Sequence, residues 1–393
     1  MAKVAVLLDG EQGHLYSTFK LARELANHGH DVWYFGYSTS EELVHEHGFK
    51  FRAVYNCVGR PQTAANAFPW LPLHREALDS LTSACHAINP ELFITLSMFC
   101  AEALVLKLSH RKPVILVRNH FDPLPRKRCC RQIVTLKLMD PSTASGQLIQ
   151  ALRDCGLVSI TSDNVAQLVI DHMPEVVLLP RELAFKHLED EQMTYAGFMI
   201  DAERPQERSF PWECIPPDKG LIYCSFGSNA YLERAVTYRF FQLLVDTMAE
   251  CPDRYLILST GPGLTATDLH APRNVYVTDW APQIEVLNRV DLMLNHGGIG
   301  SVKECLVKGV PMVVFPLMRD QFSCAERLIQ LGLALPGDVR TVSIETLKSL
   351  IEAGLTSDNL RSMVSSMRGR CGVDDSASVI RVVNKSIAEI RSI

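Results

Sequence analysis

No stretch of this 393-residue sequence is apolar over the length that a membrane span requires, and no short-period repeat or low-complexity tract occurs. The N-terminus lacks the apolar segment and cleavage site of a secretory signal, because Val4–Leu8 is short and leads directly into Asp9-Gly10. A basic balance is missing as well, since the formal net charge is -5, which gives no reason to expect nucleic acid as a partner. We therefore expect a cytoplasmic globular protein without an integral membrane segment.

Several short motifs are also missing. The 12 cysteines form no C-x-x-C pair, and only Cys129 and Cys130 are adjacent, so free thiols in a reducing cytosol are expected rather than a disulfide or zinc framework. The first strand-to-helix turn has no G-x-G-x-x-G, which disfavours a nicotinamide-dependent Rossmann enzyme. No Asp-x-Asp pair occurs either.

The sequence instead alternates short apolar runs with amphipathic helical segments, which predicts an α/β fold with parallel sheets. Val4–Leu8 is typical of a buried parallel strand. The helix after it has an apolar face made of Leu15, Phe19, Leu21, Ala22 and Leu25. A second strand–helix series begins at Leu221–Cys224, after the proline-rich stretch Asp201–Pro217. We predict two Rossmann-like doubly wound domains, residues 1–204 and 218–375, and a final helix at 376–393.

Three segments of the first half have a weaker pattern. Gly59–Pro72 is expected to be a loop whose aromatic side chains, Phe68 and Trp70, either line a binding pocket or pack beneath the loop. The basic stretch from Arg126 to Arg131 is interpreted as a solvated loop face. Val158–Ile160 is expected to be a short strand.

The turn from His296 to Ser301 (His-Gly-Gly-Ile-Gly-Ser) follows an apolar strand and opens a helix, which suits an anion. Its glycines let backbone N–H groups approach closely, and the helix start adds partial positive charge. His296 and Ser301 offer further donors from their side chains. A second turn, Ser225-Phe226-Gly227-Ser228, offers N–H groups and hydroxyls to another side of a diphosphate. Taken alone, such glycine turns also occur in ordinary strand-to-helix connections.

Other groups near this turn suit the rest of a nucleotide sugar. Glu304 lies at i+3 from Ser301 on the same helix face, where its carboxylate can accept ribose hydroxyls. Trp280, in Trp-Ala-Pro-Gln, offers an indole face to a nucleobase. Asp320-Gln321 follows the next strand and suits sugar hydroxyls. Each residue alone also fits a structural role, but their joint spacing predicts a nucleotide-sugar site.

This block resembles the donor-binding signature of the family 1 UDP-glycosyltransferases, in particular bacterial enzymes that act on macrolides and other natural products. The matching residues are Trp280, Pro282-Gln283, His296, Gly298, Ser301, Glu304, Gly309-Val310-Pro311, Pro316 and Asp320-Gln321. The resemblance implies the GT-B fold, in which two such domains face a cleft. It implies a nucleotide site made of Ser225, Gly227, Ser228, Trp280, Ala281, Gln283, His296, Gly298, Gly300, Ser301 and Glu304, with Asp320 and Gln321 on the sugar. Ile299, Gly300 and Cys324 depart from the plant version of the pattern.

His14 follows the first strand in the segment Gly13-His14, which resembles the opening of the same family. An imidazole can take a proton from an attacking hydroxyl, and the resemblance implies that His14 is this general base; a helix-capping or cleft-lining role is the alternative. The family usually orients this base with an aspartate, but Ser97 stands at that position here. Asp9 or Asp122 could replace it, the acceptor could be acidic enough to need little help, or the chain could be catalytically incompetent.

These residues together predict an inverting transferase that moves a glucose-like hexose from a UDP-sugar, or a TDP-sugar, to a hydroxyl of a small aromatic or polyketide-like acceptor. We expect no metal, because a helix N-terminus can neutralise the diphosphate, and no cofactor apart from the nucleotide sugar as co-substrate. A monomer or homodimer is expected. The alternatives are another GT-B enzyme, such as a nucleotide-sugar epimerase or a peptidoglycan-precursor N-acetylglucosaminyltransferase, and a helper protein that binds the nucleotide without catalysis.

Overall fold

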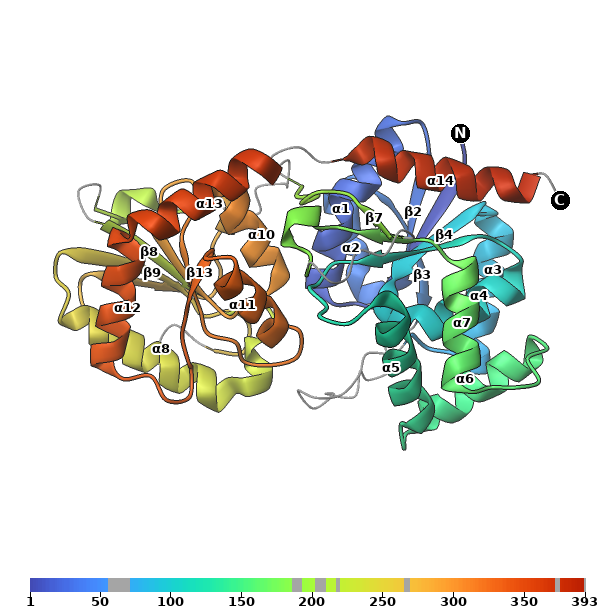
Figure 1. Ribbon diagram of the computed structural model, residues 1–393, viewed down its shortest axis with the longest axis horizontal. Helices are drawn as coiled ribbons and strands as arrows, with labels where there is room; N and C mark the ends of the chain where they lie inside the picture. Colours follow the sequence, from blue (N-terminus) through green and yellow to red (C-terminus); the bar gives the residue numbers. More distant parts are fainter. Residues whose placement is uncertain are drawn as a thin grey trace. The chain divides into compact units, whose positions relative to one another are not determined.

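The computed structural model describes residues 1–55, 71–185, 193–201, 210–216, 220–264, 269–371 and 375–391. These residues form two compact units (Figure 1). Unit 1 contains the described residues up to Asp201 together with 375–391, and unit 2 contains those of 210–371. The predicted linker Asp201–Pro217 lies mostly outside the described residues, as do Phe68 and Trp70.

Unit 1 is built on a parallel sheet of seven described strands in the order β3-β2-β1-β4-β5-β6-β7. Their bounds are β1 (Lys3–Leu7), β2 (Asp31–Tyr37), β3 (Lys50–Tyr55), β4 (Leu92–Leu96), β5 (Val114–Arg118), β6 (Glu175–Val177) and β7 (Met193–Tyr195). Every residue of β4 and β5 is buried, because helices cover both faces of the sheet. The chain leaves β1 toward β2 and later returns to β4 on its other side. The carboxyl ends of β1 and β4 therefore form a topological switch point, the usual place for a ligand in such sheets.

The helices of unit 1 are α1 (Gln12–Asn27), α2 (Glu41–Glu46), α3 (Arg75–Ile88), α4 (Cys100–His110), α5 (Arg126–Met139), α6 (Thr143–Asp154), α7 (Ser162–His172) and α14 (Ser376–Arg391). The predicted apolar face of α1 is buried, and Gly29, with φ +84°, follows its C-terminus. The last helix, α14, packs against α1, β4, β5 and β7. It places Val379, Val383 and Ile387 in the apolar core of this unit.

Unit 2 is built on a parallel sheet of six described strands in the order β10-β9-β8-β11-β12-β13. Their bounds are β8 (Gly220–Ser225), β9 (Arg254–Ser259), β10 (Val275–Thr278), β11 (Leu292–Asn295), β12 (Met312–Val314) and β13 (Ala334–Pro336). The helices are α8 (Arg234–Ala249), α9 (Gln283–Val286), α10 (Ile299–Lys308), α11 (Gln321–Gln330), α12 (Ile344–Thr356) and α13 (Asp358–Cys371). The chain runs from β8 to β9 and β10 on one side of β8 and then crosses to β11 on its other side. The switch point therefore lies between β8 and β11.

Two predictions for unit 1 are wrong. The stretch from Arg126 to Arg131 is the start of helix α5, not a solvated loop: Arg126 is 2% exposed and Cys129 and Cys130 are buried, although Lys127, Arg128 and Arg131 do face solvent. The positive charge of the stretch suggested exposure to solvent, but Arg126 is buried because it pairs with a buried carboxylate. The expected strand Val158–Ile160 is irregular, and the Val158 side chain is fully exposed.

The expectations about membrane spans and about cysteines can be compared with the described residues. None of their helices combines the length and apolarity needed to cross a lipid bilayer. The ten cysteines whose side chains the structure describes are all free, and the Sγ atoms of Cys100 and Cys130 lie 3.7 Å apart without a disulfide.

Candidate active site

His296 lies at the carboxyl edge of the unit 2 sheet, between the loops that follow β8 and β11. A Cβ atom added at Gly298 would lie 2.3 Å from its Nε2, and one added at Gly227 would lie 2.9 Å from its Cε1. Real side chains do not approach so closely, so glycine at both positions allows the imidazole to sit against the two loops. The predicted residues Gly227, His296 and Gly298 are thus brought together at the switch point.

The imidazole of His296 is neutral in this environment. Burial lowers its pKa to about 4, and the nearby Asp320 carboxylate opposes this only in part. Its Nδ1 atom is buried and has no hydrogen-bond partner among the described residues. The ring also forms a hydrogen bond with the Ser225 backbone, which opposes the lowering of the pKa. A neutral ring carries one N–H group and one acceptor nitrogen.

The N-terminus of α10 offers backbone donors beside His296. Gly298 is the N-cap residue, and no side chain caps the helix there. The N–H groups of the first turn, which includes Gly300 and Ser301, have no acceptor within the helix and carry partial positive charge. The N–H of Gly297, which we expected to contribute, instead donates to the Asn295 Oδ1 atom at 2.7 Å. The run of backbone N–H groups that remains available at this turn is therefore shorter than the sequence suggested and begins after Gly297.

Gln283, Ser301 and Glu304 form one polar cluster at the start of α9 and along α10. The Gln283 Nε2 atom lies 3.1 Å from Ser301 Oγ and donates to Glu304 Oε2 at 2.6 Å. Ser301 and Glu304 are buried, and Gln283 is half-buried. The predicted i+3 relation therefore does place hydroxyl and carboxylate on one helix face, and Gln283 joins them.

Trp280 and Ala281 precede this cluster in the loop after β10. Ala281 is buried and the Trp280 side chain is half-buried, so part of the indole remains exposed to solvent. The Thr278 hydroxyl donates to the Trp280 backbone carbonyl at 2.8 Å, which holds the loop against the end of its strand. An aromatic ring supported in this way suits stacking of a planar base.

Ser225 is the last residue of β8 and is buried, while Ser228, in the loop that follows, is half-buried. Beneath it, the hydroxyl of Tyr223 forms hydrogen bonds with the side chains of Ser225 and Ser259, and burial raises the pKa of Tyr223. Sequence reasoning missed Tyr223, Ser259 and Asn295. Polar residues within the apolar strands β8, β9 and β11 were the available signal.

Asp320 and Gln321 end the loop after β12 and begin α11. The Gln321 Oε1 atom accepts hydrogen bonds from the backbone N–H groups of Leu317 and Met318, both at 2.9 Å. Arg319 adopts a left-handed conformation with φ +52°, which turns the chain into the helix. Gln321 therefore shapes this loop with its oxygen, whereas the half-buried Asp320 carboxylate does not cap the helix that it precedes.

In unit 1, His14 lies in the first turn of α1, directly after the switch-point strand β1. Its Nδ1 atom forms a hydrogen bond of 2.7 Å with Asp9 Oδ1, and the Asp9 side chain is 4% exposed. Asp9 thus provides a buried carboxylate on one ring nitrogen. Ser97, at the end of β4, is buried in the short 3-10 helix Ser97–Phe99.

A second set of contacts fixes the turn of α1 that carries His14. The Ser17 hydroxyl donates to the His14 backbone carbonyl at 2.7 Å, and the Asn119 side chain donates to Ser17 Oγ at 3.0 Å. Asn119 is buried in the loop between β5 and α5. This loop, which follows the second strand along from β1 in the sheet, therefore supports the position of His14.

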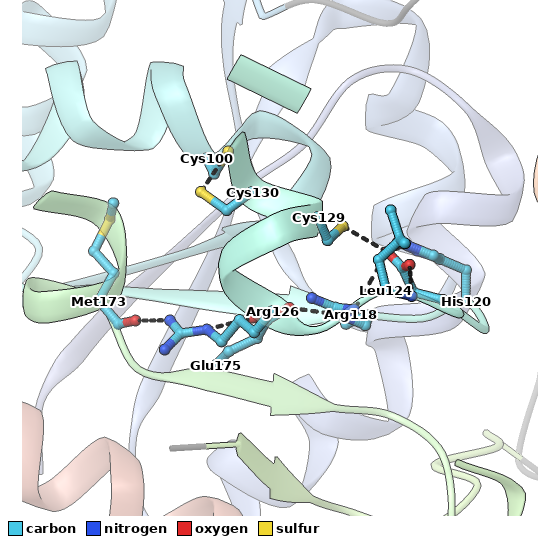
Figure 2. Close-up of polar contacts among 10 residues, drawn as sticks. Cys100, Arg118, His120, Leu124, Arg126, Cys129, Cys130, Met173 and Glu175 are labelled. Atoms are coloured by element: carbon cyan, nitrogen blue, oxygen red, sulfur yellow. Dashed lines mark hydrogen bonds and ion pairs between the residues drawn. The ribbon is translucent and has the colours of Figure 1, made fainter. Parts of the chain in front are cut away.

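Figure 2 shows that buried ion pairs hold the β5–α5 loop and its flanking elements. Glu175 accepts from Arg118 Nε and Arg126 Nε, each at 2.7 Å. Burial alone would raise the pKa of Glu175, but the two guanidinium groups outweigh it and keep the carboxylate charged. Asp122, one of the expected substitutes beside His14, instead lies 3.4 Å from Arg118 Nη1 and accepts from the Leu124 N–H at 2.9 Å.

The loop of His14 also contains a possible set of metal ligands. One ligand atom each from Asp9, Glu11 and His14 lie within 4.8 Å of one another, close enough to hold a metal ion. Carboxylate and imidazole donors suit several divalent ions. The expectation that no metal is needed therefore stays a prediction.

Comparison with known proteins places these residues in a family. The model of the UDP-glucoronosyl and UDP-glucosyl transferase family matches residues 166–366, just over half of the chain. Demethyllactenocin mycarosyltransferase of Streptomyces fradiae is 35% identical over 162 residues, which cover 40% of this chain and 33% of that protein. Oleandomycin glycosyltransferase of Streptomyces antibioticus is 29% identical over 217 residues, covering 53% and 49%. The chain thus spans about a third to a half of the length of these curated relatives.

Solved structures with the same fold cover the whole chain. The glycotransferase of kitacinnamycin has a TM-score of 0.79 at 24% identity, with 98% of each chain covered. The spinosyn rhamnosyltransferase SpnG, solved with thymidine diphosphate, has a TM-score of 0.71 at 16% identity, covering 97% of this chain and 100% of that one. The predicted α/β fold class with two doubly wound sheets, the GT-B fold, is confirmed. The chain belongs to the UDP-glucoronosyl and UDP-glucosyl transferase family.

Proposed function

We propose that the protein is an inverting glycosyltransferase that needs no metal. It moves a glucose-like hexose from a UDP-sugar or TDP-sugar to a hydroxyl of a small natural product of aromatic or polyketide type. The observation that carries this proposal is the hydrogen bond between Asp9 and His14 at the switch point of unit 1. It gives a chain of this family a base that is ready to act, although Ser97 stands where the resembled pattern has a carboxylate.

Unit 2 supplies the donor site in this proposal. Trp280 stacks on the base, Glu304 accepts ribose hydroxyls, and Asp320 accepts hydroxyls of the sugar. The hydrogen bond from Gln283 Nε2 supports this role for Glu304, because it orients the carboxylate before the ligand arrives. Both nucleotides stay in the proposal, since a structural neighbour was solved with thymidine diphosphate and the family is described by UDP-sugars.

The base step follows from the tautomer that Asp9 selects. A carboxylate accepts from an N–H group, so the proton of neutral His14 lies on Nδ1 and Nε2 carries the free lone pair. The acceptor hydroxyl gives its proton to Nε2 while its oxygen forms a bond to the anomeric carbon. Asp9 then stabilises the imidazolium that results.

The N-terminus of α10 stabilises the diphosphate leaving group in this proposal. As the new C–O bond forms, the bond from the anomeric carbon to the diphosphate breaks, and its electron pair stays on the diphosphate oxygen. The first-turn N–H groups of α10, His296 and the Ser225–Ser228 loop donate to this growing negative charge. Attack from the opposite face in one displacement inverts the anomeric carbon, which takes an α-linked donor to a β-glycoside.

The proposal is tested by separating transfer from nucleotide binding. His14→Ala should lower transfer by about 10²- to 10⁴-fold, because it removes the general base. Binding of UDP and TDP, measured by calorimetry, should stay within about twofold of the native protein. A screen of nucleotide sugars by thermal shift identifies the donor first, and aromatic and polyketide-like acceptors follow. Equal loss of binding and transfer would contradict the base assignment. Binding without any transfer in the native protein would identify a nucleotide-binding helper instead.

Metal removal tests a further part of the proposal. Because the helix terminus and His296 neutralise the diphosphate, dialysis against EDTA should leave the transfer rate within about twofold of its starting value. Added Mg²⁺, Mn²⁺ or Zn²⁺ should not raise it. A rate that EDTA abolishes and one of these ions restores would show that Asp9, Glu11 and His14 hold a metal ion.

A further inference from the structure

Glu11 lies near the ring nitrogen of His14 that does not contact Asp9. Its Oε2 atom is 3.8 Å from His14 Nε2, and its side chain is 16% exposed. Glu11 is the N-cap residue of α1, yet its carboxylate makes no capping hydrogen bond to that helix. Its backbone N–H donates to Asp9 Oδ1 at 3.3 Å, so the same aspartate that orients His14 also fixes the backbone from which Glu11 projects.

A separation of 3.8 Å is too long for a hydrogen bond between Glu11 and the ring nitrogen, but it suits two neighbouring donors on one ligand. An acceptor hydroxyl that donates to Nε2 places its oxygen ~2.8 Å from that nitrogen. The two oxygens of a vicinal diol in the gauche form, or of a catechol, are about the same ~2.8 Å apart. The second donor of such a group then falls within hydrogen-bonding reach of Glu11.

We infer that Glu11 determines acceptor specificity by selecting molecules with a second hydrogen-bond donor, a hydroxyl or a protonated amine, on the carbon next to the attacking hydroxyl. This inference rests on the proposed function, in which Nε2 of His14 is the base. The carboxylate accepts only, so it binds a vicinal O–H or N–H group and repels a lone pair presented by an ether or carbonyl.

The expected selectivity follows from the charge on Glu11. A hydrogen bond to a charged group contributes enough to favour the vicinal donor by about 10- to 100-fold in kcat/KM. A methyl ether at the same position keeps the oxygen and most of the shape, but it removes the donor and leaves the carboxylate without this partner. The hydroxyl and ammonium forms differ in one respect: an ammonium gains from the negative charge itself, whereas a hydroxyl needs only an acceptor.

The experiment compares matched acceptors across variants at Glu11. The probes are a catechol, its mono-methyl ether, and a vicinal amino alcohol with the analogue that carries a methoxy group in place of the amine. The proteins are the native chain, Glu11→Ala, Glu11→Gln, and the control Glu24→Gln, which removes a carboxylate elsewhere on α1 where it pairs with Lys20. Thermal unfolding of each variant establishes that it is folded, and UDP binding establishes that unit 2 is intact.

In the native protein and in Glu24→Gln, kcat/KM should be about 10- to 100-fold higher for the free catechol or the free amino alcohol than for its matched derivative. Glu11→Ala should bring the two values to about the same level, because it loses activity only on the preferred acceptor. Glu11→Gln should keep most of a catechol preference and lose an amine preference, which identifies the source of the donor. Equal use of the paired acceptors by the native protein overturns the inference, as does an equal loss on both members in Glu11→Ala. Activity that depends on a divalent cation also overturns it, because Glu11 is then a metal ligand. Absence of transfer to every acceptor, with nucleotide still bound, removes the proposed function and this inference together.

Discussion

Asp9 and His14 are five positions apart in one loop, so the contact between them depends on local backbone geometry rather than on a neighbouring strand. Asp9 is almost fully buried, and its carboxylate accepts from both the His14 ring and the Glu11 N–H. A carboxylate on Nδ1 favours the imidazolium that forms when His14 takes a proton. The proposed base is therefore organised within the first turn after β1.

Replacement of Asp9 tests this organisation. In Asp9→Asn the side-chain amide can donate to Nδ1, so the proton moves to Nε2 and the base is lost; we expect kcat to fall by about 10²- to 10⁴-fold. UDP binding by calorimetry should not change. Ser97→Asp provides the matched control, because it introduces a carboxylate at the position of the resembled pattern. Partial recovery of kcat in the double variant would support a shared role, and an undiminished kcat in Asp9→Asn would contradict it.

His296 makes stability depend on pH in a defined window. Its pKa is near 6.5 when unfolded and about 4 in the folded protein, so the unfolded state binds more protons between these values. Stability therefore rises with pH across this window, and full protonation costs at most about 3 kcal/mol.

The measurement is chemical unfolding at several pH values from 4 to 7 for the native chain and for His296→Gln. The variant lacks the titrating ring, so its stability should fall less steeply below pH 6.5 than that of the native protein. Parallel curves would contradict the assignment. Diphosphate binding should become relatively tighter toward acid pH in the native protein only, because the ligand favours the protonated ring.

At the scale of elements, the ion pairs of Glu175 join the start of β6 to the end of β5 and the start of α5. Glu175→Gln leaves Arg118 and Arg126 with an uncharged partner inside the protein, and we expect a loss of about 3 to 5 kcal/mol in the free energy of unfolding. The matched control is Asp163→Asn, which breaks the exposed pair with Arg131, whose side chains are 65% and 59% exposed. That change should stay within about 0.5 kcal/mol. Urea unfolding of both variants checks the contrast, which similar losses would contradict.

The same pairs show why sequence reasoning failed at α5. A run of arginine and lysine is usually exposed, whereas here a carboxylate about fifty positions away stabilises the buried Arg126. The prediction of a strand at Val158–Ile160 failed for a different reason: three residues, of which two are apolar, carry too little pattern to separate a strand from an irregular segment. By contrast, α1 had a clear apolar face with a period near 3.6, and its buried residues follow that pattern.

At the scale of the whole molecule, the alternation of apolar strands and amphipathic helices was enough to predict two parallel sheets. The polar cluster of Gln283, Ser301 and Glu304 was predictable because its members are close in the sequence. They lie on the two helices that follow the successive strands β10 and β11. Asn119 and Tyr223 were not, because their contacts join loops and strands that only the fold brings together. Local spacing therefore identified which of these groups lie together, and tertiary structure was needed to find what holds them in place.

The separation into two units predicts that they respond independently to damage and to ligand. Val383 on α14 is fully buried in the core of unit 1, although it follows all of unit 2 in the sequence. Val383→Asp places an unpaired charge in that core, and we expect a loss of about 4 kcal/mol or more. The loss should lower the unfolding transition of unit 1 alone.

Calorimetry with and without UDP can assign the two transitions, because a ligand at 100 times its Kd stabilises the unit that binds it by about 2.7 kcal/mol. UDP should raise the transition of unit 2 by the same amount in Val383→Asp as in the native chain. Asn384→Asp adds the same charge at the next, exposed position and should leave both transitions unchanged. If Val383→Asp lowered the UDP-responsive transition equally, the core that α14 completes would not belong to unit 1 alone, and the two sheets would unfold as one cooperative body.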